Sequence, residues 1–198
     1  MTDSKSPHPL KQRLCGRNLY LIGMMGSGKS SSGEPLAKQI SYGFIDADKV
    51  IEELLGQSIQ TIFAQQGEEQ FREIETQVLQ GIGQRHSLVV ATGGGVVTRP
   101  KNWGVLHQGI VIWLDANPRQ ILTRLESDKS QRPLLGGENK EEIFYSILKK
   151  RQPFYSEADL HLSVDTEPPE EVAKMIMEKL PSIIRTPEDP AAPQTISR

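Results

Sequence analysis

One octapeptide near the amino terminus constrains this chain more than any other feature. Residues 23–30 read Gly-Met-Met-Gly-Ser-Gly-Lys-Ser and match the pattern G-x-x-x-x-G-K-[ST] at every fixed position. The pattern requires a strand before it and a helix after it, which the apolar run 19–22 and the helix-like stretch 28–40 supply. Backbone N–H groups of such a loop surround a phosphate, and the helix points its positive end at the same anion. The sequence therefore predicts a binding site for ATP or GTP.

The members of this motif have different expected roles. Lys29 can reach the β- and γ-phosphates, so it is a candidate catalytic residue as well as a ligand. The Ser30 hydroxyl can bind Mg²⁺, and the glycines let the main chain approach the phosphates closely. The candidate ATP-binding residues of this segment are Gly26, Ser27, Gly28, Lys29, Ser30 and Ser31.

Short apolar runs alternate with helix-like segments along most of the chain. The expected strands are residues 19–22, 44–46, 88–91, 110–114 and 160–164. The expected helices are residues 28–40, 49–55, 59–65, 69–82, 118–126, 141–151 and 170–180. Such alternation produces right-handed crossovers and a parallel sheet with helices on both faces. The prediction is an α/β fold of the P-loop NTPase type, a three-layer sandwich with a central five-stranded parallel sheet.

The two ends of the chain differ from this central part. Residues 1–17 are mostly polar and residues 181–198 carry several prolines, so we expect a disordered leader and a disordered tail. One domain is expected between them, over residues 18–180. Within it, residues 127–140 form a glycine-bearing connection between two helices, and such connections often act as mobile lids.

The overall composition excludes several classes of partner. The chain has 198 residues, a net charge of −2 and one cysteine. A nearly neutral chain gives no indication of nucleic-acid binding, and no apolar run approaches the roughly 18 residues of a membrane span. A single cysteine permits no disulfide within the chain, which suits a reducing compartment. We therefore expect a cytoplasmic monomer that holds small anionic ligands with a few well-placed cations.

Two acidic residues follow the second expected strand. Asp46 and Asp48 are two positions apart, so on an extended chain both would point toward the cleft at the strand end. One could assist Mg²⁺, and the other could accept a proton from an attacking hydroxyl. The same spacing also fits a helix N-cap followed by a solvated aspartate.

Several later residues are candidates to bind an acidic substrate. Arg72 and Glu75 lie on neighbouring helical turns, and a guanidinium can bind a carboxylate through two parallel hydrogen bonds, although a surface ion pair is the alternative. Gly93, Gly94 and Gly95 follow the third expected strand and could offer N–H groups to a ligand or form a flexible turn.

Two more arginines lie toward the carboxyl terminus. Arg132, in the expected lid, could swing over the phosphates and stabilise charge during transfer, which makes it a catalytic and ATP-binding candidate. Arg151 ends an expected helix, where it could face the cleft or only stabilise the negative end of that helix. A GTPase would carry Asn-Lys-x-Asp, whereas residues 139–142 read Asn-Lys-Glu-Glu, and the protein-kinase signatures are absent. A small-molecule kinase remains.

Together these segments resemble the shikimate kinase family over about residues 17–180. The resemblance is carried by residues 23–30, Phe-Ile-Asp-Ala-Asp (44–48), Ile-Phe (62–63), Gly-Glu-Glu-Gln-Phe-Arg-Glu-Ile-Glu (67–75), Thr-Gly-Gly-Gly-Val-Val (92–97), Arg-Pro-Leu-Leu (132–135) and Arg-Gln-Pro-Phe-Tyr (151–155). It implies that ATP, with one Mg²⁺, phosphorylates the 3-hydroxyl of shikimate, a step of chorismate and aromatic amino acid biosynthesis.

The resemblance also implies roles at the acceptor side of the site. Asp48 would hold the shikimate hydroxyls and act as the base. Arg72 and Arg151 would bind the shikimate carboxylate, with Glu75 positioning Arg72. The glycines at 93–95 would line the substrate pocket.

On the nucleotide side, the resemblance implies that Ser30 binds Mg²⁺ and that Asp46 assists it. Arg132 would close over ATP, and Arg124 would lie beside the adenine with residues 165–168.

The chain departs from the family pattern at two positions. Ser31 stands where the family usually has Thr, and Glu34 stands where it usually has Arg, which puts nucleotide affinity or local stability in question. Two other functions remain open: a different small-molecule kinase, such as a gluconate kinase, and a non-catalytic nucleotide-binding homologue. Loss of Lys29, Asp48 or Arg132 would favour the second of these, and all three are present.

Overall fold

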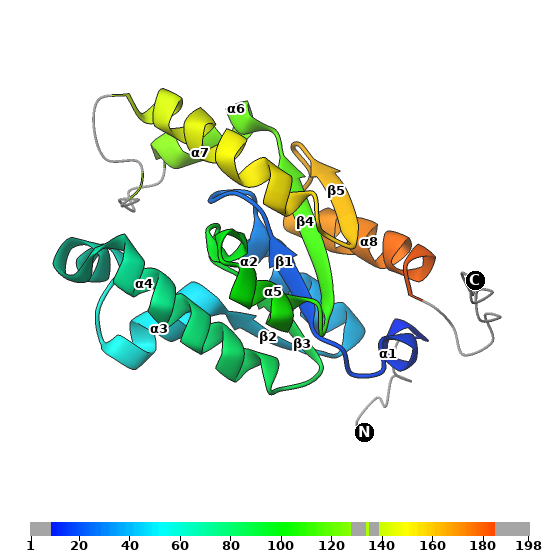
Figure 1. Ribbon diagram of the computed structural model, residues 1–198. Coiled ribbons are helices and arrows are strands. Elements are labelled where there is room, and N and C mark those ends of the chain that lie inside the picture. Colours follow the sequence, from blue (N-terminus) through cyan, green and yellow to red (C-terminus); the bar gives the residue numbers. More distant parts are fainter. Residues whose placement is uncertain (1–8, 128–133, 135–138, 185–198) are drawn as a thin grey trace, which may run out of the picture.

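Five short parallel strands form the centre of the computed structural model (Figure 1), which describes residues 9–127, 134 and 139–184. The strands are β1 (Leu19–Ile22), β2 (Gly43–Asp46), β3 (Leu88–Ala91), β4 (Ile110–Ala116) and β5 (Leu160–Val164). Their order in the sheet is β2-β3-β1-β4-β5, so β1 lies in the middle. Leu19 pairs with Val89 of β3 on one side and with Ile110 of β4 on the other. The predicted five-stranded parallel sheet of a P-loop fold is confirmed.

Helices cover both faces of this sheet. The helices are α1 (Pro9–Leu14), α2 (Lys29–Ile40), α3 (Ala47–Leu55), α4 (Ile59–Gly83), α5 (Pro100–Leu106), α6 (Pro118–Ser127), α7 (Lys140–Tyr155) and α8 (Pro169–Lys179), with short 3₁₀ turns η1 (Val96–Thr98) and η3 (Leu180–Ser182). In Figure 1, α2 and α8 lie together behind the sheet, and α4, α5 and α7 lie in front of it. No helix among the described residues is both long enough and apolar enough to cross a membrane.

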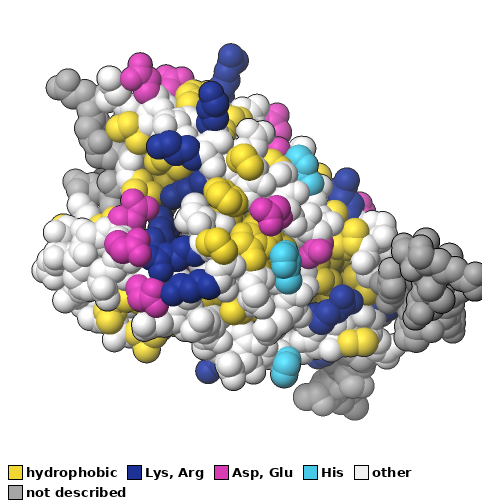
Figure 2. Space-filling model, viewed as in Figure 1, with side chains coloured by type: hydrophobic (Ala, Val, Ile, Leu, Met, Phe, Trp, Pro, Cys, Tyr) yellow, Lys and Arg dark blue, Asp and Glu magenta, His cyan; other side chains and the backbone are white. Residues whose placement is uncertain are grey.

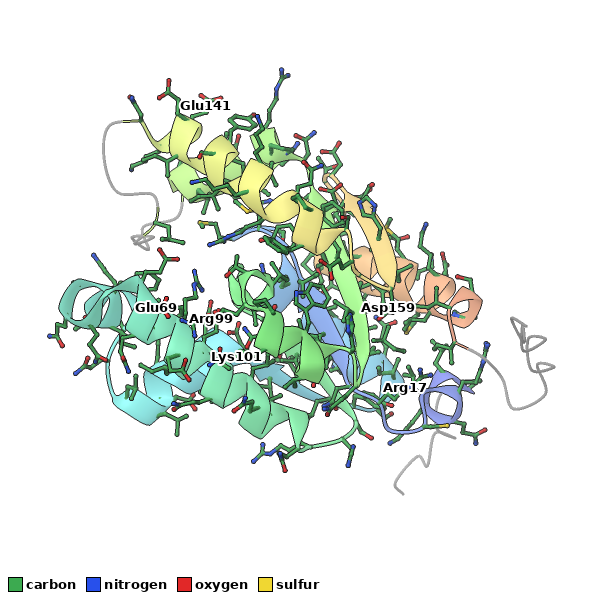
Figure 3. The ribbon with its side chains drawn as sticks, viewed as in Figure 1. Arg17, Glu69, Arg99, Lys101, Glu141 and Asp159 are labelled. Carbon is green, nitrogen blue, oxygen red and sulfur yellow. The ribbon has the colours of Figure 1, made fainter. Side chains whose placement is uncertain are left out.

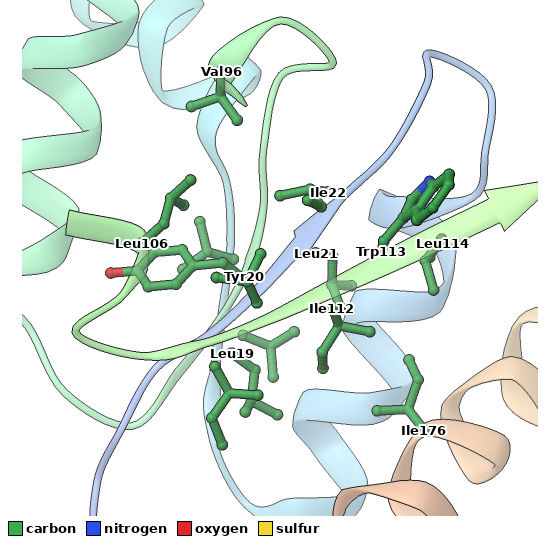
Figure 4. Close-up of a cluster of buried hydrophobic side chains, with 14 of the residues drawn as sticks. Leu19, Tyr20, Leu21, Ile22, Val96, Leu106, Ile112, Trp113, Leu114 and Ile176 are labelled. Carbon is green, nitrogen blue, oxygen red and sulfur yellow. The ribbon is translucent and has the colours of Figure 1, made fainter. Parts of the chain in front are cut away.

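The core forms where these layers meet. All four residues of β1 are buried, because a parallel strand covered on both faces has no side exposed to water. Figure 4 shows Val96 and Leu106 on one side of this strand and Ile176 of α8 on the other. The continuous apolar runs of the sequence are the direct consequence of this two-sided burial.

Local signals set the helix boundaries near the site. The Asp46 carboxylate caps α3 by accepting hydrogen bonds from the N–H groups of Asp48 (3.1 Å) and Lys49 (3.3 Å). Helix α3 therefore begins at Ala47, earlier than the expected residue 49. Helix α4 contains one residue outside helical geometry, Gly67, with φ 78° and ψ 172°. Gly67 therefore separates the two helices that were expected on either side of it, and α4 is kinked at this residue.

The structure differs from the sequence expectations at four other places. Residues 9–17 were expected to be disordered, but they are ordered, and Leu10 and Leu14 of α1 are buried in the core. The Arg13 guanidinium also donates to the Ile184 carbonyl (2.8 Å), which ties this helix to the end of the described chain. The elements η1 and α5 were not expected. Helix α7 continues through Pro153 to Tyr155, past the expected end at residue 151. The outer parts of the leader and tail, and most of the expected lid 127–140, lie outside the described residues.

Candidate active site

The candidate site lies at the carboxyl edge of the sheet, where three loops meet. The phosphate loop follows β1, the acidic segment 46–48 follows β2, and residues 92–95 follow β3. These loops surround a cavity of about 480 Å³. Ligands of open parallel sheets bind at this edge. The predicted nucleotide-binding residues among those described all line the cavity, namely Gly26, Ser27, Gly28, Lys29, Ser30, Ser31 and Arg124.

The backbone of the phosphate loop depends on glycine. Gly28, which precedes α2, has φ 91°, and Gly23 has φ 139°, both in a region that other residues avoid. A Cβ atom on Gly23 would also lie 2.5 Å from the Leu114 carbonyl oxygen. Helix α2 starts directly after this loop, so its positive end faces the cavity.

Lys29 is held in the wall of this cavity. Its side chain is buried, and its ammonium donates to the carbonyl oxygens of Gly23 (2.9 Å) and Met24 (2.7 Å). The main chain thus fixes a positive charge beside the space that a phosphate chain would occupy.

Ser30 and Asp46 form a pair of oxygen donors at the same wall. The Ser30 hydroxyl donates to Asp46 Oδ2 at 2.5 Å, while Asp46 Oδ1 accepts from the start of α3. Asp46 is therefore a helix cap and also lines the cavity. Hydroxyl and carboxylate oxygens are ligands that Mg²⁺ accepts, and the ion takes the rest from water and phosphate. The residues present fit this ion.

Asp48 lies in the first turn of α3 and not on an extended strand. The reasoning from strand alternation was therefore wrong, although its outcome holds, because Asp46 and Asp48 both line the cavity. Asp48 is half-buried and also lines a second cavity, of about 80 Å³. It is not the fully solvated aspartate that the alternative required.

This second cavity adjoins the first and contains the residues expected to bind an acid. Arg72, Glu75, Arg151 and the glycines at 93–95 line it, and the rings of Phe63 and Phe71 complete its apolar side. Met25, Asp48 and Gly94 line both cavities. The predicted substrate-binding residues therefore come together in one pocket beside the phosphate loop.

Arg72 is buried and doubly paired. Its guanidinium donates to Glu75 Oε2 at 2.9 Å and to Glu68 Oε1 at 3.2 Å, and only 6% of the residue is exposed. Burial alone would lower the pKa of Arg72, but the carboxylates of Glu75 and Glu68 raise it, so the side chain stays charged. The alternative of an exposed surface ion pair does not apply.

Burial and neighbouring charges have opposing effects on the pKa of Glu75. Burial raises the pKa of its carboxyl group, with a further rise from nearby Asp48, while Arg72 acts to lower it. One carboxylate oxygen, Oε2, is bonded to Arg72, and the other, Oε1, has no hydrogen-bond partner among the described residues. Buried polar atoms are normally satisfied, and Glu75 lines the second cavity, so this oxygen is a candidate to accept a hydrogen bond from a ligand there.

The glycines after β3 let these charged groups approach the main chain. A Cβ atom on Gly93 would overlap the Glu75 carboxylate and lie 2.9 Å from Asp48 Oδ1. A Cβ atom on Gly95 would overlap the guanidinium of Arg72. The triplet is therefore a close-contact surface for charged side chains and not only a flexible turn.

Arg151 of α7 lines this pocket, and Tyr155, one helical turn later, holds the glycine segment beside it. Arg151 is buried, and the Tyr155 hydroxyl donates to the Gly94 carbonyl oxygen at 2.6 Å. Burial raises the pKa of Tyr155 to about 12, although Arg151 acts to lower it. Sequence reasoning missed the role of Tyr155 because α7 was expected to end at residue 151. The i, i+4 spacing of the two residues is the signal that a longer helix would have supplied.

Two nucleotide-side residues remain. Arg124 of α6 donates to the carbonyl oxygens of Gly26 (3.3 Å) and Asp165 (3.2 Å), so it connects the phosphate loop to the segment after β5. Arg124 also lines the large cavity. Arg132 lies outside the described residues.

This fold and these adjoining cavities define the class of the protein, a P-loop kinase of small molecules. A sequence profile described as shikimate kinase matches residues 25–181. A shikimate kinase from Prochlorococcus marinus (strain MIT 9313) is 58% identical over 187 residues, which cover 94% of this chain and 97% of that protein. The chain belongs to the shikimate kinase family.

Solved structures agree with this assignment. The shikimate kinase from Acinetobacter baumannii, determined in complex with shikimate, superposes with a TM-score of 0.83 at 38% identity and covers 88% of this chain and 98% of its own. A gluconokinase from Sinorhizobium meliloti 1021 has a TM-score of 0.52 at 16% identity, over 85% of this chain and 94% of its own. The second likeness shows only the shared fold.

Proposed function

We propose that this protein transfers the γ-phosphoryl group of ATP to the 3-hydroxyl of shikimate, giving shikimate 3-phosphate and ADP for chorismate biosynthesis. The observation that carries the proposal is the arrangement of two cavities around Asp48. One cavity is walled by the phosphate loop, and the other holds two buried arginines suited to a small carboxylate. We expect the enzyme to act as a monomer in the cytoplasm.

In this proposal, different residues bind the carboxylate and the reacting hydroxyl of the acceptor. Arg72 and Arg151 bind the carboxylate of shikimate, because buried guanidinium groups form strong charge-assisted hydrogen bonds. Asp48 binds the hydroxyl to be phosphorylated, at the boundary between the cavities. Glu75 holds Arg72 in place through the 2.9 Å ion pair.

The reaction exchanges one bond at the γ-phosphorus for another. The acceptor oxygen forms a bond to the γ-phosphorus as the bond from that phosphorus to the β-phosphate oxygen breaks. Asp48 takes the hydroxyl proton, and ADP leaves. Lys29 stabilises the negative charge on the transferring group from the cavity wall, and we propose the same role for Arg132.

Ser30 and Asp46 would hold Mg²⁺ in this scheme. Their hydroxyl and carboxylate oxygens lie 2.5 Å apart on the phosphate side of the site. When bound, the ion neutralises charge on the β- and γ-phosphates. The protein itself contributes the positions of Lys29, Asp48 and the arginines.

An ADP-release assay with three acceptor conditions tests the proposal. The purified chain is given ATP and Mg²⁺ with shikimate, with gluconate or with no acceptor. We expect ADP release that depends on shikimate and a phosphorylated product in equal amount. Equal or faster release with gluconate would assign a different substrate, and nucleotide binding without turnover would indicate a non-catalytic homologue.

A further inference from the structure

We propose that Arg99 is a positioning residue, which holds Arg72 ready for the substrate carboxylate by occupying the acidic side chains around it. The inference rests on the proposed function, since it concerns how the acceptor is bound. Arg99 follows η1, outside the segments that predict the site, and it lines neither cavity.

Arg99 connects the start of α5 to helix α4. Its guanidinium donates to Glu73 Oε2 at 2.8 Å, to the Glu69 carboxylate, and to the Glu69 carbonyl oxygen at 3.3 Å. Only 16% of the Arg99 side chain is exposed, whereas Glu69 is 92% and Glu73 is 41% exposed. Figure 3 shows Glu69, Arg99 and Lys101 side by side across this junction, and Figure 2 shows basic and acidic side chains adjacent on the same face.

The two glutamates bonded to Arg99 flank Arg72 on α4. Glu69 is three residues before Arg72 and Glu73 is one residue after it, and Glu69 lies only two positions beyond the kink at Gly67. The bond from Arg99 to the Glu69 carbonyl therefore fixes the main chain of α4 where regular geometry resumes. This contact sets the direction of the helical turn that carries Arg72.

The charge balance gives Arg99 a second effect. Arg72 is already bonded to Glu68 and Glu75, and Arg99 engages Glu69 and Glu73. A carboxylate three positions away on a helix is a close neighbour, so a Glu69 released from Arg99 would compete for Arg72. It would also add negative charge where an anionic acceptor must bind.

The segment that carries Arg99 is itself fixed against the substrate pocket. Gly95, whose main chain packs against the Arg72 guanidinium, immediately precedes η1, and the Thr98 hydroxyl donates to its carbonyl oxygen at 2.7 Å. Asn102 and Trp103 of α5 hold η1 by donating to the carbonyl oxygens of Val96 (2.7 Å) and Val97 (3.0 Å). One rigid segment thus contacts Arg72 directly through Gly95 and controls its acidic neighbours through Arg99.

Steady-state kinetics of Arg99→Gln, Arg99→Lys and Lys101→Gln test the inference. We expect Arg99→Gln to raise KM for shikimate about fivefold, the upper range for a surface ion pair, with kcat and KM for ATP within about twofold. Arg99→Lys should recover part of this loss, since it keeps the charge without the forked donor geometry. Lys101→Gln is the control. Among the described residues Lys101 bonds only the Glu73 carboxylate, which Arg99 still holds in this variant, so KM should be unchanged.

A neutral acceptor distinguishes positioning of Arg72 from general damage. With the methyl ester of shikimate, which lacks the carboxylate charge, Arg99→Gln and wild type should have the same kcat/KM. An equal loss with shikimate and its ester, or an unchanged KM for shikimate, would overturn the inference while leaving the proposed function intact. Absence of shikimate turnover in the wild type would refute both. If Arg99→Gln does not fold, Arg99→Lys decides, with an expected rise in KM for shikimate of about twofold.

Discussion

A single methyl group on Gly95 is expected to disable acceptor binding. Gly95 has φ −100° and ψ −3°, so an alanine suits its backbone. The added Cβ atom would instead overlap the guanidinium of Arg72, which is only 6% exposed, so the guanidinium would have to shift. Gly95→Ala must therefore displace Arg72 from its ion pair with Glu75.

The size of the effect follows from the interaction that is lost. A hydrogen bond between charged groups contributes about 1.5–3 kcal/mol, which corresponds to a rise in KM for shikimate of roughly 10- to 150-fold. Displacing Arg72 should also lower the free energy of unfolding, by about 1–3 kcal/mol, because the Glu75 carboxylate loses its buried partner. KM for ATP should change by less than about twofold, since the three atoms nearest to the new methyl group all belong to Arg72, which does not line the nucleotide cavity.

Initial-rate kinetics and urea unfolding measure these quantities. Gly104→Ala is the matched control, because it lies within α5 and no atom is within 4 Å of its Cβ position. That variant should keep wild-type KM values and gain up to about 1 kcal/mol of stability. A Gly95→Ala enzyme with wild-type KM for shikimate would refute the assignment of Arg72 to the acceptor pocket.

Three further predictions concern the proton, the metal and pH. Asp48→Asn should fold and keep its KM for ATP while kcat falls about 10²- to 10⁴-fold, and a wild-type kcat would remove Asp48 as the base. Asp46→Asn should keep the α3 cap, so its free energy of unfolding should change little. It should nevertheless need about 10- to 100-fold more Mg²⁺ for the half-maximal rate. An unchanged Mg²⁺ titration would contradict the metal assignment. For Tyr155, burial raises the pKa to about 12, so the folded state keeps a proton that the unfolded state loses above about pH 10. Its stabilising contribution is complete below that pH and disappears as pH rises toward 12, so Tyr155→Phe should lose roughly 1.3 kcal/mol less unfolding free energy than wild type between pH 9 and 11. Equal losses in urea titrations of the two proteins would show that Tyr155 titrates normally.

The strands were the most predictable part of this fold. All five lie within two residues of the predicted positions. The central strand β1 is continuously apolar because it is covered on both faces, whereas β5 is recognised by the alternation of Leu160, Leu162 and Val164 with exposed residues. The helix break at Gly67 was also predicted from the sequence, and the structure has a positive φ at this residue.

The short helices could not be predicted for a physical reason. Helix α1 has six residues, too few to be stable alone, and its order depends on burial of Leu10 and Leu14 against distant parts of the chain. Helix α5 is of similar length and is fixed through Asn102 and Trp103. Such contacts leave no periodic pattern in the local sequence.

The residues of the candidate site also differ in how well the local sequence predicts them. The phosphate loop follows from its own spacing, since every group that matters is local. Arg99, in contrast, bonds residues 26 and 30 positions away, and nothing in its neighbourhood distinguishes it from a surface cation. Asp46 and Asp48 both line the cavity as expected, but Asp48 does so from the first turn of α3 and not through strand alternation.

The wall shared by the two cavities also matters for inhibitor chemistry. Met25, Asp48 and Gly94 border both spaces, so a molecule joining a nucleotide to an acid must pass between these three residues. A linker that donates a hydrogen bond to Asp48 would fit between these residues, whereas a bulky linker would clash there and an anionic linker would be repelled by the carboxylate. The space between Met25, Asp48 and Gly94 therefore limits the size and charge of the linker in any bisubstrate ligand for the enzyme.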